Sequence, residues 1–217
     1  MAFRSVSTLG NLRSFLGLDE LRLGSKKFKV AILLIIIGVV GRLLLLNLAN
    51  IETVLVASLL AGTYLGGIYV IIVPVSIMLL TDVIVYITKY PAFYQLGDIA
   101  LLAVFVYSGY VLVSLFGATT RRRLIFRLKS IAILTAISIP ATILFDIWTA
   151  TGMWVTIFGK APYGYSIWQT YAMQIPFTCL HIISALVFVP IFGTIFLYYL
   201  SESVEVPATA ITSSDDT

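Results

Sequence analysis

Cysteine, histidine and charged residues are scarce in this sequence. Of its 217 residues one is cysteine, one is histidine and 11% are charged. The single cysteine, Cys179, excludes an intramolecular disulfide and a CxxC metal or redox motif. A single histidine argues against zinc, haem and iron-sulfur chemistry. We therefore expect no metal site and no cofactor.

Motifs of the common catalytic classes are also missing. There is no Walker motif, so the chain does not hydrolyse ATP by that route. Neither G-x-S-x-G nor H-E-x-x-H occurs, and the serines of the apolar stretches have no histidine and acid at a spacing visible in the sequence. The net charge of +4 comes from basic residues that flank apolar stretches rather than from a soluble basic patch. We expect neither an enzyme nor a nucleic-acid-binding protein.

Long hydrophobic runs are what the sequence has in abundance. It is 60% hydrophobic, with a mean hydropathy of +1.04. A helix crosses a bilayer with about 20 apolar residues and satisfies its own backbone hydrogen bonds. The sequence therefore predicts an all-α, polytopic protein of the cell membrane. Its apolar segments cover residues 28–48, 52–67, 68–88, 98–117, 130–153 and 173–200.

The distribution of basic residues predicts the orientation. The N-terminal 29 residues carry six Lys or Arg, and the loop after the fourth span carries five, against two on the opposite side. Basic residues collect on the cytoplasmic side of membrane proteins. Both termini are therefore predicted to be cytoplasmic, with six transmembrane helices forming a bundle.

Three regions follow from this division. Residues 1–27 form a basic N-terminal segment, which is either an interfacial helix on the anionic inner leaflet or a solvated tail. Residues 28–200 form the six-helix membrane domain, and residues 201–217 a disordered acidic tail.

Four charged or histidine side chains lie well inside the apolar segments, away from their ends: Arg42, Asp82, Asp146 and His181. A charged carboxylate at the bilayer centre costs about 2.5–3.5 kcal/mol, so such residues normally face protein or water. Counted at ~1.5 Å of rise per residue, all four lie roughly 9–12 Å below the outer surface. A cavity that opens outward would place them in one such layer, and this is the arrangement we predict.

Each of these residues also has a purely structural explanation. Arg42 and Asp82 could form a buried pair that fixes the helix register. His181 could be an ordinary hydrogen-bonded interior histidine. Trp148 could be an anchor at the membrane interface, and Glu52 a helix cap. The sequence leaves these alternatives open.

Helical spacing extends the polar layer. Thr135, Ser138, Thr142, Asp146 and Thr149 step by three and four along the fifth span, and Gln174, Thr178, His181 and Ser184 do so along the sixth. Carboxylates set against one arginine predict a ligand with an amine or ring nitrogen on Asp82 and Asp146, and an anionic group on Arg42. The predicted ligand-binding residues are Arg42, Asn50, Glu52, Asp82, Tyr86, Asp146, Trp148, Gln174 and His181.

Small residues form a face on the second span. They are Ala57, Ala61, Gly62 and Gly66. Faces of this kind let membrane helices approach closely. They serve either packing inside the same bundle or docking onto another membrane subunit.

Several stretches, taken in order, resemble a known family. NLANIETVLVASLLAGTYLGG, PVSIMLLTDVIVY, FDIWTATGMWV and QIPFTCLHIISALVF are similar to the substrate-binding (S) subunits of energy-coupling factor (ECF) vitamin transporters. More narrowly, they resemble an uncharacterised group of S-subunit-like membrane proteins. The resemblance covers about residues 38–195. It implies that Asn50, Asp82, Asp146 and the outer loops line the ligand pocket.

The resemblance also implies partners. An S subunit captures a micronutrient outside and releases it inside, together with a transmembrane coupling subunit and two ATPase subunits. This chain departs from the pattern on the first helix, where VAILLIIIG stands in place of an Ala-x-x-x-Ala docking motif. We expect a capture subunit that binds a small vitamin-like solute. The alternative is a non-transporting structural subunit of a larger membrane complex.

Overall fold

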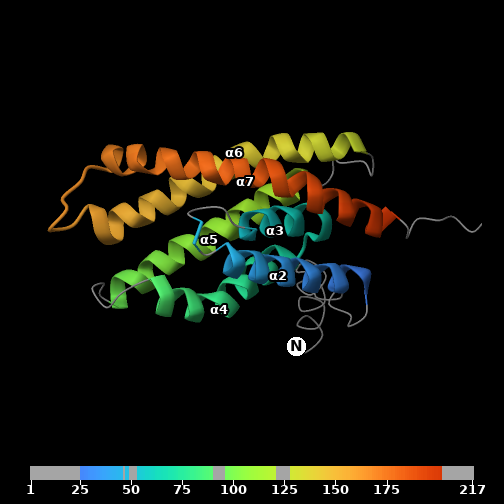
Figure 1. Cartoon of the computed structure of the whole chain (residues 1–217), viewed down its shortest axis with the longest axis horizontal. Coiled ribbons are helices and arrows are strands. Elements are labelled where there is room, and N and C mark those ends of the chain that lie inside the picture. Colours follow the sequence, from blue (N-terminus) through green and yellow to red (C-terminus); the bar gives the residue numbers. More distant parts are fainter. Residues whose placement is uncertain (1–24, 46, 49–52, 90–95, 121–127, 202–217) are drawn as a thin grey trace, which may run out of the picture.

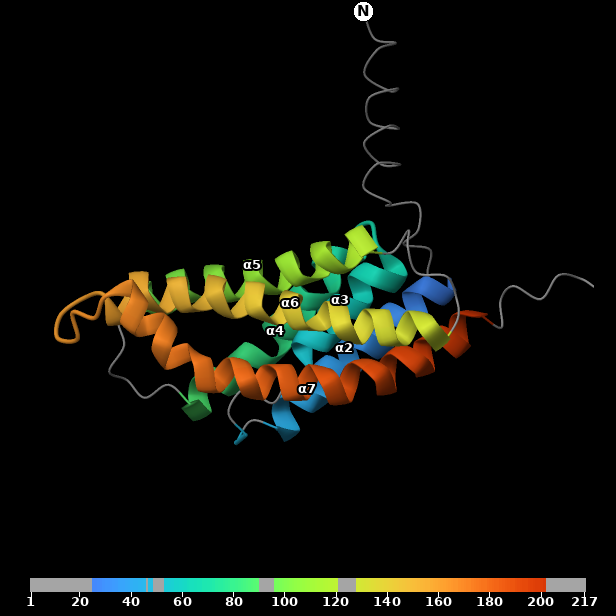
Figure 2. The same ribbon diagram turned by 90° about the horizontal axis from the view of Figure 1, so that it is seen from above.

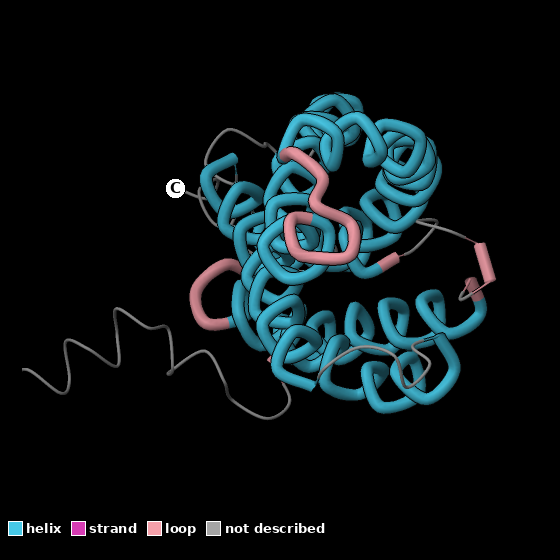
Figure 3. Tube along the Cα trace, turned by 90° about the vertical axis from the view of Figure 1, so that its left-hand side faces the viewer, coloured by secondary structure: helices cyan, strands magenta, loops and turns pink. Residues whose placement is uncertain are grey.

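The described part of the chain is entirely helix and loop. The computed structural model describes residues 25–45, 47–48, 53–89, 96–120 and 128–201. Within these ranges there is no strand (Figure 3). The predicted all-α class is confirmed. The basic segment 1–27 and the acidic tail 201–217 lie almost wholly outside the described residues.

The described ranges contain six α-helices, one for each predicted apolar segment. They are α2 (Lys26–Leu44), α3 (Val54–Leu60), α4 (Tyr69–Lys89), α5 (Leu96–Thr120), α6 (Leu128–Met153) and α7 (Ile167–Ser201). Two π-helical turns, η2 (Ala61–Leu65) and η4 (Trp154–Phe158), extend α3 and α6. Three helical stretches, 97–120, 129–158 and 167–200, are long and apolar enough to cross a membrane, and the apolar stretches 54–65 and 69–84 are shorter.

The short helix α3 is the centre of the molecule. Every residue of Val54–Leu60 is buried, and α3 lies between α2 on one side and the α6–α7 pair on the other (Figure 1). The turn η2, which continues α3, lies close to α5, since a Cβ at Gly62 would overlap the backbone carbonyl of Ser114. The small-residue face Ala57, Ala61, Gly62 and Gly66 is therefore buried inside the bundle. Of the two interpretations of this face, the structure shows internal packing.

Two glycines separate the central helix from α4. Gly66 and Gly67 have φ values of 64° and 54°, in the left-handed region that glycine adopts without steric cost. The amide of Tyr69 then donates to the carbonyl of Gly66 at 3.2 Å as α4 begins. The chain thus reverses within a few residues, as the predicted boundary between the second and third segments requires.

The helix α7 begins earlier than its apolar run. The Ser166 hydroxyl accepts the amide of Gln169 at 3.2 Å, while the Gln169 side chain accepts the amide of Ser166 at 2.7 Å. This reciprocal arrangement is a capping box. It starts α7 at Ile167 rather than at Met173, and it extends the stretch over which α6 and α7 run side by side (Figures 1 and 2).

Candidate functional site

The first polar cluster joins α2, α4 and α5. Arg42 Nη1 lies 2.9 Å from Asp82 Oδ1, and it also donates to Thr81 Oγ1 at 2.5 Å and contacts Met78 Sδ at 2.9 Å. On the other side, the Tyr107 hydroxyl donates to Asp82 Oδ2 at 2.7 Å. Both carboxylate oxygens of Asp82 therefore have partners within the protein.

This cluster has the geometry of a structural pair. The side chains of Arg42 and Asp82 are only 13% and 16% exposed. Met78 and Asp82 are one turn apart on α4, so both face α2, as their spacing predicts. Because the donors come from α2 and α5 and the acceptor from α4, the cluster fixes the register of three helices.

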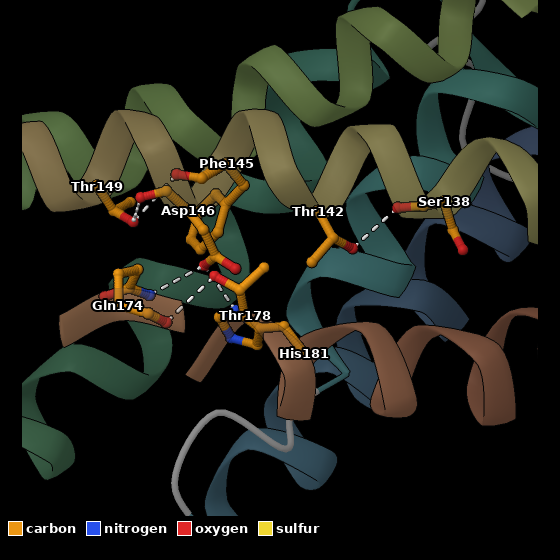
Figure 4. A network of polar contacts seen from close by, with 8 residues as sticks. All are labelled: Ser138, Thr142, Phe145, Asp146, Thr149, Gln174, Thr178 and His181. Carbon is orange, nitrogen blue, oxygen red and sulfur yellow. Dashed lines mark hydrogen bonds and ion pairs between the residues drawn. The ribbon is translucent and has the colours of Figure 1, made fainter. Parts of the chain in front are cut away.

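The second polar cluster joins α6 and α7. His181 Nδ1 lies 2.7 Å from Asp146 Oδ1, and Gln174 Nε2 donates to the same oxygen at 3.3 Å (Figure 4). With Asp146 ionised, the histidine proton is assigned to Nδ1, since that nitrogen must donate. The His181 ring also packs edge-on against Phe145, with centroids 5.7 Å apart. Asp146 and His181 are 2% and 6% exposed.

The two oxygens of Asp146 differ in their surroundings. Oδ1 accepts from two side chains, whereas Oδ2 is buried without a hydrogen-bond partner in the described structure. A buried polar atom without a partner costs about 1–3 kcal/mol, and more when it is charged. Such an atom is found in native proteins where a ligand, ion or water completes it. Both oxygens of Asp82 have protein partners, and this distinguishes Asp82 from Asp146.

Asp146 also lies in the wall of a cavity of about 580 Å³. This volume is in the range of small-molecule sites, about 300–1,000 Å³. All of its lining residues belong to α6 and α7, and they are Ile143, Asp146, Ile147, Trp168, Tyr171, Ala172, Gln174, Ile175, Thr178 and Cys179. Because α6 leads into the α6–α7 loop and α7 leaves it, the cavity lies toward that end of the molecule.

The four predicted titratable residues thus form two pairs, one on α2 and α4 and the other on α6 and α7. Of the four, only Asp146 is in the cavity wall. The structure therefore does not place Arg42, Asp82 and His181 around this cavity.

Other predicted site residues lie elsewhere or are not described. Trp148, on α6, donates from Nε1 to Ser108 Oγ of α5 at 2.9 Å and packs against Phe105, away from the cavity wall. Asn50 and Glu52 lie outside the described residues, and so does the side chain of Tyr86.

The hydroxyl stripe of α6 is satisfied within its own helix. Thr135 donates to the carbonyl of Ile131, Thr142 to that of Ser138 and Thr149 to that of Phe145, at 2.8–3.0 Å. Ser and Thr hydroxyls in helices often bond back to the preceding turn. These groups therefore do not need a ligand.

Several cavity residues were not predicted as ligand-binding. Trp168, Tyr171, Ile175 and Cys179 lie on one face of α7 at helical spacing. Trp168, Ile175 and Cys179 are exposed and Tyr171 is partly exposed. In an apolar span, exposed residues of this kind are typical of an ordinary lipid-facing surface. The sequence feature that could have identified this face is its pair of aromatic residues, Trp168 and Tyr171, next to the polar stripe that contains Gln174.

The described residues offer no cluster of three or more His, Cys, Asp or Glu side chains able to hold a metal ion. Asp146 with His181 is the largest grouping of such side chains that the described contacts contain, and two ligands are fewer than the usual number for zinc.

Comparison with known proteins gives one relationship. No curated protein and no solved structure matches the chain. The profile of a family of unknown function, DUF6580, matches residues 24–208, which covers every helix of the described fold. The chain therefore belongs to the DUF6580 family.

Proposed function

We propose that this protein captures a small vitamin-like solute in the membrane, as the substrate-binding subunit of an ECF-type importer. One observation carries the proposal. A buried carboxylate, Asp146, keeps one oxygen without a partner and lies in the wall of a 580 Å³ cavity. A buried acceptor beside a space of that size is the arrangement of a ligand site.

The membrane setting is part of the proposal. We infer six transmembrane helices with both termini cytoplasmic, in a multi-pass protein of the cell membrane. The exposed surface supports this, because it carries large apolar side chains on every long helix, among them Leu79, Val83, Val104 and Ile195, each more than half exposed. Water would disfavour such a surface, whereas lipid accommodates it. In this orientation the α6–α7 loop and the cavity near it are on the outer side.

The role of an importer subunit adds partners. The resemblance to S subunits implies a transmembrane coupling subunit and two ATPase subunits, since the chain has no Walker motif of its own. A capture subunit alone would bind the solute but would not drive it across the membrane.

Native mass spectrometry of the gently purified protein tests this function. We expect a small molecule bound to the wild-type chain, together with a coupling protein and ATPases in the same membrane extract. Asp146→Asn should lose the bound mass. Asp98→Asn should keep it, because Asp98 lies at the outer start of α5 and pairs with Lys160 at 2.6 Å, away from the cavity. A wild-type chain with neither a bound molecule nor ATPase partners would contradict the proposal.

A non-transporting structural subunit is the second candidate, and the Arg42–Asp82 cluster favours it. That cluster is closed, because both oxygens of Asp82 have protein partners. In this case stable partner proteins would co-purify without ATPases, and Asp146→Asn would leave their association unchanged.

A further inference from the structure

The cavity between α6 and α7 offers a hydrogen-bond acceptor and no cation. Its lining residues include no Lys, Arg or His. Asp146 Oδ2 is an acceptor without a partner. This acceptor favours a ligand that donates a hydrogen bond.

Three polar side chains of the cavity wall already make hydrogen bonds within the protein. Gln174 Nε2 donates to Asp146 Oδ1 at 3.3 Å, and Thr178 Oγ1 donates to the Gln174 carbonyl at 3.2 Å. The Tyr171 hydroxyl is paired with Thr151 Oγ1 at 2.9 Å. An anionic ligand group would therefore meet a carboxylate and no free positive charge.

The rest of the wall suits an apolar body with a positive end. Ile143, Ile147 and Ile175 supply aliphatic surface. Trp168 and Tyr171 lie edge to face, with ring centroids 5.9 Å apart. Aromatic faces attract ammonium groups within about 6 Å. Carboxylate, aromatic rings and aliphatic walls together match an amphiphilic amine.

The exposed fractions of the wall indicate the access route. Ile147 is 51% exposed, Ile175 62% and Trp168 76%, so these residues lie on the outer face of the α6–α7 pair. In the proposed membrane setting this face contacts lipid. A ligand that partitions into the bilayer can therefore reach Asp146 sideways, without passing the Arg42–Asp82 cluster.

We propose that the cavity binds a small amphiphilic amine, with its ammonium group at the Asp146 carboxylate, whose buried Oδ2 has no partner in the described structure, and its apolar body between the isoleucines. This rests on the proposed function for the membrane setting and the capture role. The amine proposal implies that the solute needs no anionic group, because Arg42 is paired with Asp82 and does not line this cavity. A phospholipid amine fits less well, since its phosphate would lie near the Asp146 carboxylate with no cation to balance it.

Three matched compounds test the ligand chemistry. The full chain is placed in phosphatidylcholine nanodiscs and titrated with 2-phenylethylamine, 2-phenylethanol and 3-phenylpropionate by saturation-transfer NMR, with empty nanodiscs as the background. A charged hydrogen bond in a shielded site corresponds to about a tenfold difference in affinity or more. We expect the amine to bind at least about tenfold more tightly than the alcohol, and the carboxylate not to bind. Equal binding of amine and alcohol would overturn the proposal.

Two variants test the location. Asp146→Asn should weaken amine binding about tenfold or more, while Asp98→Asn, a carboxylate outside the cavity, should leave it unchanged. Ile175→Trp fills the cavity from an exposed position, so it should block binding without affecting folding, which circular dichroism checks. If Asp146→Asn does not fold, Ile175→Trp still tests whether the amine binds in this cavity. Undiminished binding to Ile175→Trp would overturn the site.

Nanodiscs that contain phosphatidylethanolamine test the lipid alternative. We expect 2-phenylethylamine to bind there as it does in phosphatidylcholine, and strong competition by the lipid would overturn the choice of a small amine. The two proposals fail separately. A natural solute that stays bound to Ile175→Trp would refute this site and leave capture standing, whereas amine binding without ATPase partners would leave the site standing and refute the importer role.

Discussion

Breaking the Arg42–Asp82 pair from each side should distinguish a structural cluster from a ligand site. We consider Arg42→Met, Asp82→Leu and the double variant. Both replacements are apolar and near in volume to the originals, so each single variant removes one charge and leaves the other in place. The double variant removes both charges.

The structure gives the expected magnitudes. The two side chains are 13% and 16% exposed, and removing one partner of a buried pair costs about 3–5 kcal/mol. Arg42→Met should fall at the lower end, because Asp82 keeps the Tyr107 hydroxyl at 2.7 Å. Asp82→Leu should fall at the upper end, because the Arg42 guanidinium loses its carboxylate partner, while its contacts with Thr81 and Met78 are to neutral acceptors. The double variant should lie within about 1 kcal/mol of the wild type, since apolar replacement of a whole buried pair is often close to neutral.

Unfolding in mixed micelles, followed by far-ultraviolet circular dichroism as the SDS fraction rises, measures these differences. The double-mutant cycle isolates the coupling between the two residues. A double variant as unstable as the sum of the singles would refute a pairwise structural role. Single variants of normal stability that lose a bound solute would also refute it and would return the cluster to the ligand site.

Three further variants test particular contacts. Gly62→Ala should destabilise the fold by about 1–3 kcal/mol, because its Cβ overlaps the backbone of α5. Gly97→Ala should not, since nothing lies within 4 Å of its Cβ. The same unfolding assay compares the two variants, and equal stabilities would contradict the close contact between η2 and α5. Trp148→Phe should leave 2-phenylethylamine binding within twofold of wild type, since Trp148 is not in the cavity wall, and a tenfold loss in the NMR titration would contradict this. Lys160→Met should cost less than about 1 kcal/mol, as its pair with Asp98 is half exposed, and a larger loss on unfolding would contradict a surface role.

The helices were predictable because their signals are local. Each apolar run became a helix, and the Gly66–Gly67 break lies between α3 and α4 as predicted. The start of α7 was missed although its signal is also local, in the Ser166–Gln169 capping box. Hydropathy alone places a boundary where the residues become apolar, whereas a helix begins where its first amides find acceptors.

The composition of the candidate site was less predictable because polar spacing is ambiguous. Hydroxyls at helical spacing extend the polar layer in the sequence, yet Thr135, Thr142 and Thr149 bond to carbonyls of their own helix. Any Ser or Thr in a helix can do this without a neighbour. A carboxylate cannot, since as an ion it only accepts. Asp82 and Asp146 were therefore the informative residues, and the hydroxyls around them were not.

The common depth of the four titratable residues also needs a different interpretation. Two residues that pair across neighbouring helices must lie at the same height, whatever the function. Arg42 with Asp82, and Asp146 with His181, therefore account for two of the coincidences in depth. The sequence further predicts that both pairs share one level, which pairing alone does not require. In the described structure Asp146 Oδ2 is the one carboxylate oxygen of the two pairs without a partner. A ligand at this level therefore has one carboxylate to bind, and the Arg42–Asp82 pair holds α2 and α4 together.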